Sequence, residues 1–178
     1  MSWLRISILF FLLCGGLYPA IVTGAGQLLF HDQAQGSIVY DKSGQAAGSQ
    51  LIAQAFDKPE YFWPRASAAG TDGYDATQSG GSNLGPTNQA LIDRVKAAVG
   101  DGQDVPADAV TTSGSGLDPD ISPENALDQV PRVAKARGMP EQQLTAFVNQ
   151  HVTGRDLGIF GEPRVNVLRL NLDLDALK

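Results

Sequence analysis

A long apolar segment opens the chain, and a mixed pattern of apolar and polar positions follows it. From Ile6 to Phe30 there is no charged residue, and the segment is dense in Leu, Ile and Phe. About 20 predominantly apolar residues are enough to span a bilayer. The pattern therefore predicts a transmembrane helix over residues 6–30, preceded by a short tail of residues 1–5.

Two other interpretations of the segment compete with the anchor. Arg5 precedes an apolar stretch and small residues follow near Gly24, as in a cleaved signal peptide. A signal peptide has an apolar region of about 7–15 residues, whereas this one continues to Leu28. A lipoprotein would use Cys14, but Leu13 stands where a small residue is expected. We favour an uncleaved anchor.

The distribution of charge predicts the orientation of this anchor, and the net charge of the domain excludes some kinds of partner. Arg5 and the amino terminus are the positive groups of the tail, so the positive-inside rule predicts a cytoplasmic tail and an exported domain of residues 31–178. With Arg5 set aside, 12 basic residues face 19 acidic ones, a formal charge of −7. An acidic domain argues against nucleic acid or an anionic lipid surface as its partner.

Small residues within the predicted anchor indicate a surface for other helices. Gly16, Ala20 and Gly24 are four residues apart and lie on one face, which allows another helix to approach closely. Pro19 removes a backbone donor and should kink the helix near Tyr18, a defect tolerated where a neighbouring helix covers it. The alternative is that Gly and Ala are simply common in membrane helices.

The rest of the chain shows helical and strand patterns of an α+β domain. Apolar residues recur at helical spacing in residues 48–56, 87–99, 122–138 and 140–154. Thr87 is a plausible cap, Ser122-Pro123-Glu124 is a strong helix start, and Pro131 should bend the helix that follows. Near-alternation in residues 165–172 predicts a final strand, and residues 104–112 a short one. The fold class is α+β, with one N-terminal transmembrane helix and a compact mixed helix/strand soluble domain.

Turns and catalytic patterns narrow the possible chemistry. A hairpin is expected near residues 42–44, and residues 66–88 form a structureless segment, which in a small domain is more often functional or bound to a partner.

His31 and His151 lie far apart without further ligands at metal spacing, so no metal site is predicted. No G-x-S-x-G elbow surrounds Ser115, and a serine nucleophile would have to recruit one of the two histidines.

A Gly/Ser-rich loop precedes the helix predicted from Thr87. Successive Gly and Ser amides can form an anion-holding concavity, and a helix N-terminus favours negative charge. No lysine of the phosphate-loop kind stands beside it, so the loop is not a Walker A sequence. It is either a weak nucleotide-site candidate or a tightly packed turn. Its candidate residues are Ser79, Gly80, Gly81, Ser82, Asn83 and Gly85.

Seven ordered segments carry a resemblance to a known family. The chain resembles the KdpC family of bacterial Kdp-type potassium-transporting ATPases over essentially its whole length, including Tyr18-Pro19. It departs from the usual family pattern at Ala53 (commonly Gly), Ala66 (commonly Pro) and Asp120 (often His). The segments are Gly48-Ser49-x-Leu51-Ile52, Tyr61-Phe62-Trp63-x-Arg65, residues 79–88, Thr112-Ser113-Gly114-Ser115-Gly116-Leu117-Asp118-Pro119, Ile121-Ser122-Pro123, Arg132-Val133-Ala134-x-Ala136-Arg137 and residues 161–172.

The resemblance implies an accessory subunit of a pump in the bacterial inner membrane, not an enzyme. Its partners would be a channel-like potassium-binding subunit, a P-type ATPase subunit that hydrolyses ATP, and a very small membrane peptide. It would have no cofactor of its own and would share ATP with the hydrolytic subunit, as a catalytic chaperone that raises ATP affinity. The resemblance also implies that the loop of Ser79, Gly80 and Gly81 corresponds to an ATPase signature loop and that a glutamine contacts the nucleotide, for which Gln129 is the candidate.

The implied nucleotide role conflicts with the predicted orientation. A domain outside the membrane cannot touch cytoplasmic ATP, so it would act on assembly or as an acidic cap beside the potassium entrance. Salt would screen the attraction of such a cap for potassium beyond about 8 Å. Both roles stay open at this stage. The alternative function is a free-standing anchored periplasmic protein, either a hydrolase using Ser115 or a solute-binding module.

Overall fold

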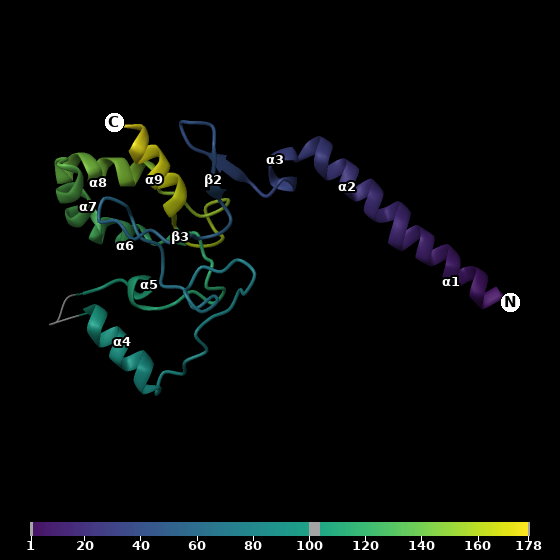
Figure 1. Cartoon of the computed structure of the whole chain (residues 1–178), viewed down its shortest axis with the longest axis horizontal. Coiled ribbons are helices and arrows are strands. Elements are labelled where there is room, and N and C mark those ends of the chain that lie inside the picture. The colour runs from purple at the N-terminus through teal and green to yellow at the C-terminus, as the bar shows by residue number, and fades with distance from the viewer. Residues whose placement is uncertain (1, 100–103, 178) are drawn as a thin grey trace. The chain divides into compact units, whose positions relative to one another are not determined.

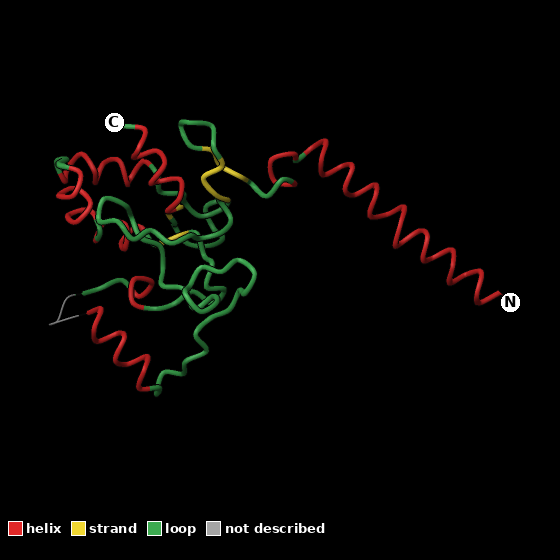
Figure 2. Tube along the Cα trace, viewed as in Figure 1, coloured by secondary structure: helices red, strands yellow, loops and turns green. Residues whose placement is uncertain are grey.

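The computed structural model describes residues 2–99 and 104–177. The chain divides into two compact units, Met1–Ile38 and Val39–Lys178. The first is almost entirely helical, whereas loops make up much of the second (Figures 1 and 2).

The first unit is an apolar helix with a short addition at its end. α1 (Ser2–Leu12), a π-helical segment (Leu13–Leu17) and α2 (Tyr18–Leu29) run on from one another, and α3 (His31–Ala34) follows. Among the described residues, one helix of 28 residues, Ser2–Leu29, is long and apolar enough to cross a membrane, with a mean hydropathy of 2.1 in its most apolar window. The helix predicted for residues 6–30 is therefore confirmed, and it begins nearer the N-terminus than predicted.

The π-helical segment lies immediately before α2, and Pro19 occupies the first turn of α2. Proline lacks a backbone N–H, and its ring crowds the carbonyl of the residue four positions earlier. A π turn widens the helix at that point and is a common way to absorb such a defect. The irregularity expected around Tyr18 thus takes the form of a wider turn.

The second unit combines short helices with two small sheets. β1 pairs with β2 in one sheet, and β3 pairs antiparallel with β4 in the other, with Ile121 opposite Val165. The hairpin predicted near residues 42–44 is confirmed between β1 and β2. The elements are β1 (Ile38–Tyr40), β2 (Ala46–Ser49), α4 (Gln89–Val99), α5 (Ala107–Val110), β3 (Asp120–Ile121), α6 (Pro123–Asp128), α7 (Val130–Arg137), α8 (Glu141–Gln150), β4 (Val165–Asn166) and α9 (Val167–Ala176).

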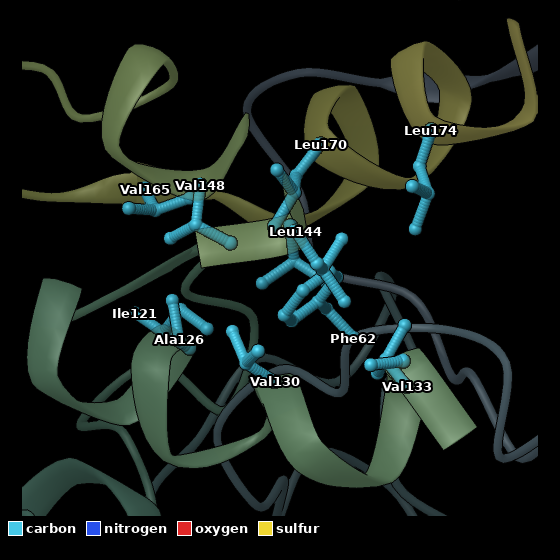
Figure 3. Close-up of a cluster of buried hydrophobic side chains, with 12 residues drawn as sticks. Phe62, Ile121, Ala126, Val130, Val133, Leu144, Val148, Val165, Leu170 and Leu174 are labelled. Atoms are coloured by element: carbon cyan, nitrogen blue, oxygen red, sulfur yellow. The ribbon is translucent and has the colours of Figure 1, made fainter. Parts of the chain in front are cut away.

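The hydrophobic core of this unit lies among α6, α7, α8 and α9. Apolar side chains of these helices converge on Leu144 and Leu170, and Phe62 joins them from a loop (Figure 3). Phe62, Leu144 and Leu170 are completely buried. Burial of a side chain of this size contributes about 1.5–3 kcal/mol. The domain thus has its own core, built mainly from the C-terminal half of the chain.

The predicted start and bend of the helical segment 122–138 are both confirmed. The Ser122 side chain accepts a hydrogen bond from the Asn125 backbone N–H, and Pro123 occupies the first turn of α6. The segment breaks at Gln129, and Pro131 stands in the first turn of α7. α7 ends at Gly138, whose φ of +66° is the left-handed conformation that glycine adopts most easily. α4 confirms the helix predicted for residues 87–99, although its capping side chain is Asn88 and not Thr87.

The predicted C-terminal strand is wrong after its first two residues. β4 covers Val165–Asn166, and the chain then enters α9. Asn166 caps this helix by accepting a hydrogen bond from the Arg169 backbone N–H. Val167, Leu170 and Leu174 are buried at helical spacing, so the apolar residues that looked alternating serve one face of a helix.

Two further predictions of secondary structure are wrong. Residues 50–56 form no helix, and Leu51 there is 63% exposed, so the apolar spacing does not mark a buried face. Residues 107–110 form the short helix α5, where a strand was predicted. Residues 66–88 contain neither helix nor strand, as predicted.

Candidate functional site

The Gly/Ser-rich loop of residues 79–85 packs against a second turn, residues 112–116. The Gly80 backbone N–H donates to the Ser115 carbonyl oxygen at 2.8 Å, and the Ser79 Oγ donates to the same oxygen at 3.0 Å. Thr112 Oγ1 donates to Ser82 Oγ at 3.1 Å. Ser79 Oγ and the Gly80 N–H, two donors that a phosphate would use, thus already have an acceptor within the protein.

Glycine is required where the two turns touch. A Cβ on Gly116 would lie 2.5 Å from the Gly80 carbonyl oxygen and 2.8 Å from the backbone nitrogen of Ala69, and its φ is +68°. A Cβ on Gly81 would lie 3.0 Å from the Gly114 carbonyl oxygen. The glycines that suggested an anion cradle thus allow close backbone packing. Asn83 adopts a left-handed φ of 52°, and Gly85 has open space around it.

Gln129 holds the backbone of an aromatic segment in place. Its Oε1 accepts from the Trp63 backbone N–H at 2.7 Å, and its Nε2 donates to the Trp63 carbonyl oxygen at 3.1 Å. The same amide accepts from Arg132 and donates to Asn125. Among the described residues, no hydrogen bond or ring contact joins Gln129 to the 79–85 loop. The structure thus shows no direct contact between Gln129 and this loop, and the nucleotide-binding role of these residues stays a prediction.

Asn171 binds the backbone of Phe62, the residue before Trp63, in the same way, a role that the sequence did not predict. Its Oδ1 accepts from the Phe62 N–H and its Nδ2 donates to the Phe62 carbonyl oxygen, both at 2.9 Å. Arg132 adds bonds to carbonyl oxygens at Pro59 and Tyr61, and its guanidinium lies 3.5 Å from the centroid of the Trp63 ring. The side-chain amides of Gln129 and Asn171 thus pair with the backbone N–H and C=O groups of this segment, as the backbone of a neighbouring strand does in a sheet.

An acidic hollow of about 990 Å³ lies in the domain. Six of its seven acidic residues lie between residues 104 and 128, and Glu162 joins them from the segment before β4. A hollow with this charge attracts cations and repels anions such as the phosphates of a nucleotide. Its charged lining consists of Asp104, Asp108, Asp118, Asp120, Glu124, Asp128 and Glu162 with Arg65 and Arg164.

Two carboxylates of this hollow have shifted pKa values for different reasons. Burial alone would raise the pKa of Asp108, but hydrogen bonds from Ser122 and Asn125 together lower it below its ordinary value. Asp108 thereby fixes the start of α6 as a carboxylate. Burial raises the pKa of Asp120, and the nearby Asp118 adds to the effect, while Asn166 and Arg164 oppose it. Because its pKa is lowered and that of Asp120 is raised, Asp108 keeps its negative charge to a lower pH than Asp120 does.

The three departures from the family pattern differ in their surroundings. Asp120 is half-buried, pairs with Arg164 at 3.3 Å and accepts from Asn166 at 3.1 Å, so it is part of the β3–β4 connection and not a free turn. Ala53 is buried, and its N–H donates to the Leu117 carbonyl oxygen. Ala66 is exposed.

Serine catalysis finds no support in the described residues. Ser115 Oγ accepts from the Leu117 backbone N–H. The ring nitrogens of His151 lie 2.9 Å from the Phe147 carbonyl oxygen and 3.0 Å from Asp173. His151 and Asp173 line another hollow, of about 470 Å³, which shares Asp120 and Arg164 with the acidic hollow. No described contact joins Ser115 to His151. Within residues 2–99 and 104–177, there is also no group of three or more His, Cys, Asp or Glu side chains that could hold a metal ion.

The small-residue face of the anchor is open along its length. A Cβ added to Gly16 or Gly24 would meet nothing within 4 Å, and Ala20 and Pro19 are exposed. The face is therefore accessible to another helix, and its role in packing stays a prediction.

An apolar helix long enough to span a bilayer, joined to one small α+β domain, is typical of membrane-anchored proteins. A family model described as KdpC: K+-transporting ATPase, c chain, matches residues 1–176. The chain belongs to the KdpC family and is an accessory subunit of a potassium pump, distinct from the pump's catalytic subunit.

Individual relatives agree with this assignment. The potassium-transporting ATPase KdpC subunit of Gemmatimonas aurantiaca is 56% identical over 173 residues, which cover 93% of this chain and 86% of the relative. The KdpC subunit of Caulobacter vibrioides is 56% identical over 174 residues, covering 94% and 88%. That of Geobacter sulfurreducens is 52% identical over 176 residues, covering 96% and 93%.

Proposed function

We propose that this chain is a non-enzymatic subunit that supports assembly of a high-affinity, ATP-driven potassium uptake pump from the outer side of the inner membrane. The observation that carries the proposal is the family match over residues 1–176, which includes both the apolar helix and the whole domain. Arg5 and the amino terminus place the short tail in the cytoplasm by the positive-inside rule. The domain of residues 31–178 is then exported.

The partners are the channel-like potassium-binding subunit, the P-type ATPase subunit and the small membrane peptide of such a pump. Within the bilayer, the face of Gly16, Ala20 and Gly24 is the surface for their helices. The open space around Gly16 and Gly24 supports this, because close helix approach in a membrane depends on small residues.

A catalytic chaperone that raises ATP affinity can act without touching ATP. A subunit that binds the ATP-competent conformation of the hydrolytic subunit more tightly than other conformations increases its population, and with it the apparent affinity for ATP. The internal hydrogen bonds of Gly80 and Gln129 favour this indirect route, as does the acidic hollow. We therefore propose that the chaperone effect passes through the assembled complex.

Purification of the pump through a tag on its hydrolytic subunit tests the proposal. Deletion of this chain is expected to reduce recovery of the intact complex and to raise the ATP concentration required for half-maximal hydrolysis. The double variant Gly16→Leu/Gly24→Leu should reduce co-purification of the chain, because two bulky side chains would prevent the close approach of a partner helix at this face. Gly26→Leu, on another face of the helix, is the matched control. Recovery of the chain as a free monomer, with assembly unchanged by its deletion, would end the proposal.

A further inference from the structure

Asp120 is a half-buried carboxylate that lines two hollows of the domain. It belongs to β3, its side chain is 26% exposed, and it lines both the acidic hollow and the hollow of His151 and Asp173. Its Oδ1 accepts a hydrogen bond from Asn166 Nδ2 at 3.1 Å, and its Oδ2 lies 3.3 Å from Arg164 Nε. Water therefore reaches only part of this carboxylate, and the contact with Arg164 balances its charge.

Arg164 lies beside two carboxylates, which it meets through different nitrogens. Its Nε faces Asp120 of β3 at 3.3 Å, and its Nη2 lies 3.9 Å from Asp156 Oδ1. Asp156 belongs to the hairpin of residues 153–164, whose base is closed by two backbone hydrogen bonds between Thr153 and Arg164. A charge-assisted hydrogen bond is about 2.7–2.9 Å long, so neither contact is at its optimum. A small movement of the guanidinium would strengthen one contact and weaken the other.

The surroundings of Asp120 disfavour its negative charge. Burial raises the pKa of Asp120, and Asp118 adds to the increase, whereas the hydrogen bond from Asn166 and the charge of Arg164 oppose it. There is thus a pH range in which Asp120 is neutral while an ordinary carboxylate is still charged. The other charged or titratable residues that line the two hollows are Arg65, Asp104, Asp108, Glu124, Asp128, Glu162, His151, Arg169 and Asp173.

We propose that Asp120 and Arg164 form an acid-sensitive switch, in which protonation of Asp120 releases the Nε of Arg164 and the guanidinium then pairs with Asp156. At neutral pH the side chain of Arg164 connects the hairpin of residues 153–164 to β3. In acid it pairs within the hairpin instead. Arginine keeps its own proton throughout, so the one proton that the switch takes up comes from the solvent. That the switch responds to the pH outside the cytoplasm rests on the proposed function, which places the domain there.

An NMR titration of the full chain in detergent tests the switch directly. The side-chain carboxyl carbon of Asp120 reports its protonation, and the Nε–H of Arg164 reports the contact between the two residues. We expect Asp120 to titrate above the ordinary value of about 4, and the Arg164 Nε–H signal to move with the same midpoint. Arg155, which pairs with Glu162 at 2.6 Å, is the internal control, and its signal should not follow that midpoint.

Two outcomes of the titration would overturn the proposal. The first is an Arg164 signal that stays unchanged while Asp120 titrates, which would show that the guanidinium does not respond. The second is an Asp120 that titrates at the ordinary value. Both measurements use the chain alone, so their failure leaves the proposed function standing.

Asp120→Asn, a permanently neutral form, supplies an independent measurement. Because burial raises the pKa of Asp120 above its unfolded value, the folded domain binds the proton more tightly than the unfolded chain does. The stability gained from this proton is complete below the unfolded value and is lost as the pH rises through the folded value. The thermal unfolding midpoint of Asp120→Asn, relative to that of the unaltered chain, should therefore be higher at pH 7 than at pH 4. A relative midpoint that is the same at both pH values would contradict the switch.

Asp156→Asn is the matched variant for the second contact of Arg164. Asp120 should still titrate in this variant, because its own neighbours are unchanged. The acid form of Arg164, however, lacks the carboxylate to which it would turn, so its Nε–H should exchange with water faster in acid than in the unaltered chain. Equal exchange rates in the two chains would show that Asp156 does not take over the pair, and would overturn the proposal.

Discussion

Gly116→Ala lowers the free energy of unfolding of the domain by about 3 kcal/mol, the sum of a left-handed alanine and an overpacked contact. The added methyl would lie 2.5 Å from the Gly80 carbonyl oxygen, which cannot move without displacing the 79–85 loop. Chemical denaturation of the full chain in detergent, followed by circular dichroism, measures the loss.

Gly138→Ala is the matched control for this change. Gly138 has nearly the same φ, +66°, but a Cβ there would meet nothing within 4 Å. We expect it to lower the free energy of unfolding by about 1 kcal/mol, the cost of a left-handed alanine alone. Equal losses in the two variants would show that the contact between the turns contributes nothing, and would reopen the 79–85 loop as a ligand site.

Asn171→Leu should lower the free energy of unfolding by about 3–5 kcal/mol, because two buried backbone groups lose their partners at about 1–3 kcal/mol each. Asn171 is 1% exposed, and the Phe62 groups that it binds belong to a residue that is completely buried. Leucine has a similar volume, so the change removes the hydrogen bonds with little change in packing. Urea unfolding of the full chain provides the measurement.

Gln129→Met is the comparison variant, because it removes the hydrogen bonds of the other side-chain amide that binds this segment. Gln129 makes the same pair of bonds to Trp63, but Trp63 is 38% exposed, so water can replace part of what is lost. We expect a loss of about 1–2 kcal/mol. An unchanged unfolding free energy in Asn171→Leu would contradict the view that side-chain amides hold this segment.

The sequence predicted correctly those elements whose conformation depends on residues that are neighbours along the chain. The apolar segment from Ile6 needs no tertiary context to be helical, and the structure places it in one continuous helix. Ser122 and Pro123 start a helix through a cap and a fixed φ, both of which depend on neighbouring residues alone. Gly138 ends the next helix for the same kind of reason.

Contacts between distant segments explain what the sequence did not predict. Residues 167–174 fit a strand or a helix by spacing, and the buried positions Val167, Leu170 and Leu174 decide for the helix only once α8 is packed beside them. The family resemblance made Gln129 a candidate for nucleotide contact, whereas in the fold its amide binds Trp63, 66 residues away. The carboxylates of the acidic hollow likewise meet only after folding.

Membrane topology in intact cells is the most direct test of an accessory subunit that works from outside. In a Cys14→Ser background, Gln143→Cys on the exposed side of α8 and Ser2→Cys in the N-terminal tail are labelled separately with a membrane-impermeant thiol reagent. The account predicts that Gln143→Cys is labelled in intact cells and Ser2→Cys only after permeabilisation. The reverse pattern would place the domain beside the ATPase, contradict the exported orientation, and make direct contact of Gln129 and the 79–85 loop with ATP the hypothesis to pursue.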